Sequence, residues 1–144
     1  MCGVFALFNQ ISSTNSIQID DITKEFMKGK GRGPEFSVLD NVSIDALFGF
    51  HRLAINGLNN QSNQPIKIGD LTLICNGEIY NYRQLYNFLN ITPTTGSDCE
   101  IILHLYKIYG IEYTLQIIDG VFSFILLDNN PENTCAYAAR DPYG

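Results

Sequence analysis

The feature that most constrains the fold is a set of strand-like segments that are apolar at almost every position. Residues 2–8 read CGVFALF and residues 121–128 read VFSFILLD. A strand with one face in water alternates apolar and polar side chains, whereas a strand covered on both faces needs no polar positions. We therefore interpret residues 2–8 as a strand buried on both faces, and we expect an α/β (α+β) fold whose sheets lie between other layers.

Periodicity and capping signals place the helices. Apolar residues recur with helical spacing in residues 81–89. Ser97 and Glu100 predict a capping box at the start of a helix over 97–110, and Gly110 is expected to end that helix. The expected elements are strands at 2–8, 43–55 (one strand or two), 71–75, 121–128 and 134–140, helices at 20–30, 81–89, 97–110 and 112–118, and loops at 9–18 and 56–65.

Composition bounds the class of protein. With 144 residues, 45% hydrophobic and 17% charged, the chain suits one globular domain over 1–144 that buries roughly two thirds of its unfolded surface. A net charge of −6 with only 9 Lys and Arg argues against a nucleic-acid partner and against an anionic membrane surface. No apolar stretch approaches the roughly 20 residues that cross a bilayer, so we expect a cytoplasmic protein. The chain closes on the turn sequence DPYG with no returning strand, so we expect a domain truncated at its C-terminus.

The four cysteines do not have the spacing of a metal site, and no metal is expected. We interpret Cys75, Cys99 and Cys135 as small core residues. Cys2 differs, because removal of Met1 would leave a thiol and a free α-amine on one residue. An α-amine has a pKa of about 7.7–8.0, so it can accept the thiol proton near neutral pH and generate the nucleophilic thiolate. The alternative is that Cys2 is only a small residue that suits N-terminal processing.

Three further positions could carry chemistry, and each has a purely structural alternative. Asn76-Gly77 is either a hairpin turn or an oxyanion hole built from a side-chain amide and a backbone N–H. Arg52 is either a surface or ion-paired residue, or a fork that holds a substrate carboxylate. Asp98 either complements a helix dipole or holds an ammonium group. Together with Cys2, these residues fit an amide hydrolase acting on a small amino acid.

The two histidines carry weaker signals. His104 shares the polar face of its predicted helix with Glu100 and Lys107, so we interpret it as solvated. His51 likewise has a weaker claim to a chemical role than Cys2, Asn76-Gly77, Arg52 and Asp98.

Seven motifs follow one another along nearly the whole chain: MCGVFALF, GRGPE, HRLAI, NGEIYNY, TGSDCEIILHLY, DGVFSFILLD and ARDPYG. Their order resembles the N-terminal glutaminase domain of the class II glutamine amidotransferases. Within that family the motifs most resemble the branch of glutamine-hydrolysing asparagine synthetase. Two positions depart from the usual family pattern: Gly31-Arg32 stands in place of His-Arg, and Glu35 in place of Asp.

The resemblance implies an N-terminal-nucleophile fold, a four-layer αββα sandwich. It implies that Cys2 attacks the side-chain amide of glutamine, that a thioester forms and ammonia leaves, and that water then releases glutamate. The implied site consists of the oxyanion hole Asn76 and Gly77, the carboxylate clamp Arg52, the pocket lining Leu53, Ala54, Ile55 and Asn56, and the carboxylates Glu78 and Asp98 near the α-amine.

The resemblance also implies that a second domain uses the ammonia that this domain releases. Ammonia would pass through a tunnel to an ATP-dependent synthetase domain, supplied in cis or in trans and absent from these residues, which contain no nucleotide-binding motif. No cofactor is expected in the glutaminase domain, and ATP and Mg²⁺ belong to the synthetase domain. The alternatives are another amidotransferase branch with a different acceptor, or an inactive remnant that binds glutamine or a partner domain.

Overall fold

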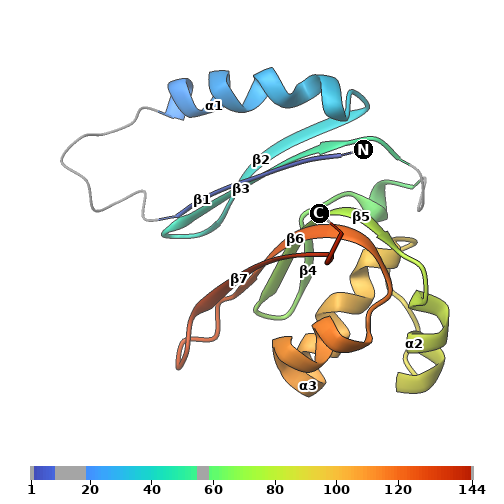
Figure 1. Cartoon of the computed structure of the whole chain (residues 1–144). Coiled ribbons are helices and arrows are strands. Elements are labelled where there is room, and N and C mark those ends of the chain that lie inside the picture. Colours follow the sequence, from blue (N-terminus) through green and yellow to red (C-terminus); the bar gives the residue numbers. More distant parts are fainter. Residues whose placement is uncertain (1, 9–18, 55–58, 144) are drawn as a thin grey trace.

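The protein forms four layers in a computed structural model, which describes residues 2–8, 19–54 and 59–143. Helix α1 covers a three-stranded sheet of order β1-β3-β2, which faces a four-stranded sheet of order β4-β5-β6-β7, and α2 and α3 cover the far side (Figure 1). All strand pairs are antiparallel. This arrangement confirms the expected αββα sandwich. The strands are β1 Gly3–Phe8, β2 Phe36–Ser43, β3 Ala46–Arg52, β4 Ile66–Ile68, β5 Leu71–Ile79, β6 Gly120–Asp128 and β7 Cys135–Arg140; the helices are α1 Ile19–Met27, α2 Tyr82–Leu89 and α3 Ile101–Ile117, with 3-10 turns η1 Lys28–Arg32, η2 Asn60–Ser62 and η3 Asp98–Glu100.

The three-stranded sheet is organised around β3, whose residues are all buried. Phe48 and Phe50 face the second sheet and join its Ile74 in one apolar cluster. On the other face, Gly49 lets α1 approach, because a Cβ there would lie 2.6 Å from a ring atom of Phe26. The prediction that residues 2–8 are buried on both faces is wrong. β1 is the sheet edge, so most of its residues are only half-buried.

The second sheet is built on the pairing of β5 with β6 from Leu71↔Asp128 to Ile79↔Gly120. The faces of these strands that point away from the first sheet pack against α2 and α3 in the larger apolar core. The predicted end of the strand at residue 75 is wrong, because Asn76 and Gly77 continue the ladder opposite Ser123 and Phe122. A Cβ at residue 77 would lie 2.2 Å from the carbonyl oxygen of Val121. Glycine at residue 77 therefore allows β5 to lie close to β6, and it does not mark a turn.

The remaining elements follow the sequence with local differences. Strands β2 and β4 were not predicted, whereas the β6–β7 hairpin is confirmed. The first helix ends at Met27 and continues as the glycine-rich turn η1. Gly110 adopts φ +77° and divides α3 into two helical pieces, as predicted. Among the described helices, none is long and apolar enough to cross a membrane.

Candidate active site

A cavity of about 150 Å³ lies where the start of β1, the end of β3 and the second half of β5 converge. Successive strand residues alternate between faces, so Asn76 points to the same side of β5 as Ile74, toward the first sheet. The cavity includes every predicted site residue that the structure describes. These are Cys2, Arg52, Leu53, Ala54, Asn76, Gly77, Glu78 and Asp98. Ile55 and Asn56 lie outside the described residues, as does Met1.

The Cys2 side chain rests against the backbone just beyond β3. Its Sγ lies 3.4 Å from the Leu53 nitrogen, which donates to it, and 3.5 Å from the Leu53 carbonyl oxygen. The carbonyl oxygen of Cys2 accepts a hydrogen bond from Arg32 Nε at 3.3 Å. The segment around Leu53 is itself held, because the Ala54 N–H donates to the Glu35 carboxylate at 3.0 Å. The sulfur therefore has a defined position on the cavity wall.

Arg52 is buried, with 7% of its surface exposed, and ends β3 at the cavity. Its Nη1 donates to the Asn59 carbonyl oxygen at 3.2 Å and to Asn63 Oδ1 at 2.5 Å. The interpretation as a residue lying on the surface is therefore wrong. The loop that precedes β4 holds the guanidinium of Arg52, which lines the cavity.

Asn76 and Gly77 form the part of the cavity wall that β5 provides. Their hairpin-turn interpretation is wrong, since both residues are paired within the sheet. The missing side chain of Gly77 brings β5 close to β6 and leaves backbone at the cavity surface. A side-chain amide next to accessible backbone is the composition that an oxyanion hole requires.

Asp98 is 4% exposed and lies in the first turn of η3, just before α3. Its Oδ2 accepts the Ile79 N–H at 2.6 Å, so the carboxylate joins η3 to the end of β5. This position suits an anion near a helix start as well as an ammonium clamp. Glu78, by contrast, is exposed at the rim of the cavity.

Gln64 was not predicted as a site residue, because its segment has only the composition of a loop. Gln64 is buried, its Nε2 donates to the Cys75 carbonyl oxygen at 2.9 Å, and its Oε1 accepts the Cys75 N–H at 2.5 Å. The side chain thus replaces a neighbouring strand where β4, which pairs only with residues 71–73, does not reach. Loop composition carries no signal for this contact, because the partner is reached only after folding.

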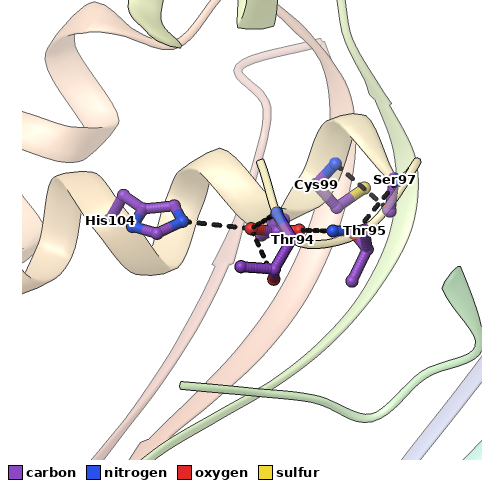
Figure 2. A network of polar contacts seen from close by, with 6 residues as sticks. Thr94, Thr95, Ser97, Cys99 and His104 are labelled. Carbon is purple, nitrogen blue, oxygen red and sulfur yellow. Dashed lines mark hydrogen bonds and ion pairs between the residues drawn. The ribbon is translucent and has the colours of Figure 1, made fainter. Parts of the chain in front are cut away.

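Glu100 was predicted to cap a helix, but its side chain is completely buried. Its Oε1 accepts from Thr94 N (2.8 Å), Thr94 Oγ1 (2.9 Å) and His104 Nε2 (3.1 Å), and its Oε2 accepts from Thr95 N at 2.6 Å (Figure 2). Burial raises the pKa of Glu100, but these hydrogen bonds outweigh it and lower the pKa to about 2. Ser97 caps the start of η3 as predicted, because its side chain accepts from the Cys99 N–H. The reciprocal half of the capping box is wrong, because Ser97 N donates to Thr95 Oγ1 and not to Glu100. The prediction of a solvated His104 is also wrong, because His104 turns toward the buried carboxylate.

The His51 side chain is held by contacts with β2 and α1. Its Nδ1 lies 2.8 Å from Ser37 Oγ and its Nε2 lies 2.9 Å from the Phe26 carbonyl oxygen, while its ring stacks on Phe26 at 4.0 Å. These contacts fix α1 on the first sheet. Within the described ranges, no group of three or more His, Cys, Asp or Glu side chains is placed to hold a metal ion.

The fold has two facing antiparallel sheets between helical layers, and the second residue of the chain lies on a cavity that strands of both sheets line. These features define an N-terminal-nucleophile hydrolase architecture. The sequence model described as "Glutamine amidotransferase domain" matches residues 1–144. The chain belongs to this family, which confirms the resemblance found in the sequence.

Similar proteins agree with this assignment. The glutamine-hydrolysing asparagine synthetase of Gallus gallus is 41% identical over 149 residues, covering 100% of this chain and 25% of that protein. The Homo sapiens asparagine synthetase is 39% identical over 150 residues with the same coverage. The glutamine phosphoribosylpyrophosphate amidotransferase of B. subtilis superposes with a TM-score of 0.56 and 25% identity, over 68% of this chain and 23% of that one. The chain spans about a quarter of the length of the relatives that it matches.

Proposed function

We propose that this domain hydrolyses the side-chain amide of glutamine to glutamate and ammonia, with Cys2 as nucleophile after removal of Met1. The observation that carries the proposal is that the Cys2 sulfur shares one cavity with Arg52, Asn76, Gly77 and Asp98. A nucleophile, an oxyanion site and two clamps of opposite charge are what cleavage of an amino-acid amide requires.

The substrate would be held by its amino-acid end. Arg52 would pair with the α-carboxylate, because its planar fork matches carboxylate geometry. Asp98 would accept hydrogen bonds from the α-ammonium, with Glu78 at the cavity rim adding negative charge. Arg52 and Asp98 are both nearly buried, so little water competes for them. This arrangement leaves the side-chain amide to extend toward Cys2.

The reaction would proceed in two halves. The α-amine of Cys2 takes the thiol proton, and the thiolate attacks the amide carbon to give a tetrahedral oxyanion. The Asn76 side-chain amide and the Gly77 backbone N–H would stabilise that oxygen. The intermediate collapses as the α-ammonium returns its proton to the leaving nitrogen, so that ammonia departs and a thioester remains. Water, deprotonated by the same amine, then releases glutamate and restores the thiol.

We also propose that the ammonia serves asparagine synthesis. Relatives at about 40% identity over the whole of this chain are glutamine-hydrolysing asparagine synthetases, whereas the phosphoribosylpyrophosphate enzyme reaches 25% over 68% of it. The synthetase reaction, with its ATP and Mg²⁺, would belong to a partner domain in cis or in trans, and the glutaminase domain itself would need no cofactor.

The proposal is tested by measuring glutamate release from glutamine by the wild-type protein and by Cys2→Ala. We expect release by the wild type and none above background by the variant, with both proteins folded by melting curve. Glutamate release that survives in Cys2→Ala would overturn the assignment of the nucleophile. For the acceptor, glutamine labelled with ¹⁵N in the amide should yield labelled asparagine when a synthetase domain, ATP and aspartate are present.

A further inference from the structure

We propose that Glu100, which does not line the cavity, is a positioning residue that holds both substrate clamps in register. The inference rests on the proposed function, because it takes Asp98 and Arg52 as the clamps for the α-ammonium and the α-carboxylate. It is carried by a set of hydrogen bonds that holds the loop of residues 94–97 on the buried Glu100 carboxylate and links the same loop, through Ser62 and Asn59, to Arg52. Asp98 follows this loop directly in the chain.

The first part of this set immobilises the loop before η3. Glu100 accepts four hydrogen bonds, three of them from Thr94 and Thr95, and its side chain is completely buried (Figure 2). The loop also braces itself, since Ser97 N donates to Thr95 Oγ1 at 3.1 Å and Ser97 Oγ accepts from Cys99 N at 3.3 Å. Hydrogen bonds to a buried charge are among the stronger ones, so the loop conformation depends on the Glu100 carboxylate.

The second part leads from the loop to Asp98. This residue lies between Ser97, the last residue of the loop, and Glu100, and both Ser97 and Asp98 line the cavity. Its carboxylate is held from the opposite side by the Ile79 N–H of β5 at 2.6 Å. Displacement of the loop would therefore pull Asp98 away from the position that β5 fixes.

The third part leads from the same loop to Arg52. Gly96 N donates to Ser62 Oγ at 2.9 Å, and Ser62 Oγ donates to Asn59 Oδ1 at 2.8 Å. The Asn59 carbonyl oxygen in turn accepts from Arg52 Nη1 at 3.2 Å. Contiguous networks of hydrogen bonds couple the positions of the residues at their two ends. The distance between the two clamps is thereby tied to the loop that Glu100 holds.

The chemistry of the site explains why a carboxylate is needed at residue 100. Every neighbour that contacts it in the hydrogen bonds above is a donor: the N–H groups of Thr94 and Thr95, the Thr94 hydroxyl and the His104 ring. A glutamine would have nearly the same shape, but its amide nitrogen would set a donor against a donor. Glu100→Gln is therefore a small change in volume that directly disturbs the loop.

The test compares Glu100→Gln with Glu112→Gln, a matched control at an exposed position of α3, the helix that begins directly after Glu100. Steady-state kinetics on glutamine are combined with alkylation of Cys2 by two reagents. One is a chloroketone analogue of glutamine that keeps the α-amino acid, and the other is iodoacetamide, which does not. We expect Glu100→Gln to raise KM and the half-saturation for the chloroketone roughly 10–100-fold, the scale of a misplaced positioning group. Alkylation by iodoacetamide and both constants for Glu112→Gln should stay at wild-type values.

The outcomes separate the two proposals. A wild-type protein that neither hydrolyses glutamine nor is saturably alkylated by the chloroketone refutes the proposed function. An active wild type together with unchanged constants in a folded Glu100→Gln refutes the positioning role alone. If Glu100→Gln does not fold, His104→Leu and His104→Gln replace it: a KM raised in His104→Leu and restored in His104→Gln, which keeps a donor, supports the inference, and an unchanged KM in His104→Leu overturns it.

Discussion

The replacement Glu100→Gln also gives a quantitative prediction about stability in acid. Folding lowers the pKa of Glu100 from 4.5 to about 2, because the hydrogen bonds from Thr94, Thr95 and His104 outweigh burial. One pKa unit corresponds to about 1.4 kcal/mol, so the shift is equivalent to about 3 kcal/mol of stability. Since the folded-state pKa is the lower one, this contribution is complete above pH 4.5 and disappears as the pH falls toward 2.

Urea unfolding of the wild type and of Glu100→Gln, measured at several pH values between 6 and 2, checks this prediction. Groups that titrate alike in both proteins cancel in the difference between their free energies of unfolding. We expect the wild type to exceed the variant by about 3 kcal/mol more at pH 5 than at pH 2, whereas Glu112→Gln should follow the wild type throughout. A difference between wild type and Glu100→Gln that stays constant over this range would refute the reasoning.

Three further replacements test the cavity itself. Asn76→Ala should lower kcat for glutamine roughly 10²–10³-fold with little change in KM, because an oxyanion donor acts on the transition state; a normal kcat with a depressed melting temperature would contradict this role. Gly77→Ala should destabilise the fold by roughly 1–3 kcal/mol, since its Cβ would lie 2.2 Å from the Val121 carbonyl oxygen, whereas Gly31→Ala meets nothing within 4 Å and serves as the control in chemical denaturation. Arg52→Lys keeps the charge but loses the planar fork, so KM for glutamine should rise by a factor equivalent to roughly 1.5–3 kcal/mol; an unchanged KM would speak against the carboxylate clamp.

The layered fold could be predicted from the sequence because its signal is local. The apolar segment 121–128 indicated a covered sheet, and it forms β6 in the interior of the four-stranded sheet. β1 misled the same reasoning, since its composition resembles that of a central strand while its place in the sheet is an edge. Composition reports what a strand can tolerate, whereas the number of its neighbours is decided by the whole fold.

In the candidate site, too, local sequence patterns failed where tertiary contacts decide the structure. Asn76-Gly77 is a strong turn signal over four residues, yet the pairing of β5 with β6 overrides it. Glu100 has the spacing of a capping box, but its partners in the preceding loop lie outside that motif. Gln64 gave no signal, because its contact with Cys75 exists only when β5 is in place. Candidate residues marked by short motifs could be identified in the sequence, whereas contacts that form only in the folded chain could not.

The central claim is that Cys2 works only as the first residue, with its own α-amine as base. The direct measurement is glutamate release by protein whose intact mass shows the loss of Met1, compared with the same protein in which Met1 is retained by blocking its removal. We predict turnover in the first sample and none above background in the second, with equal melting temperatures. Equal turnover by protein that fully retains Met1 would contradict the account.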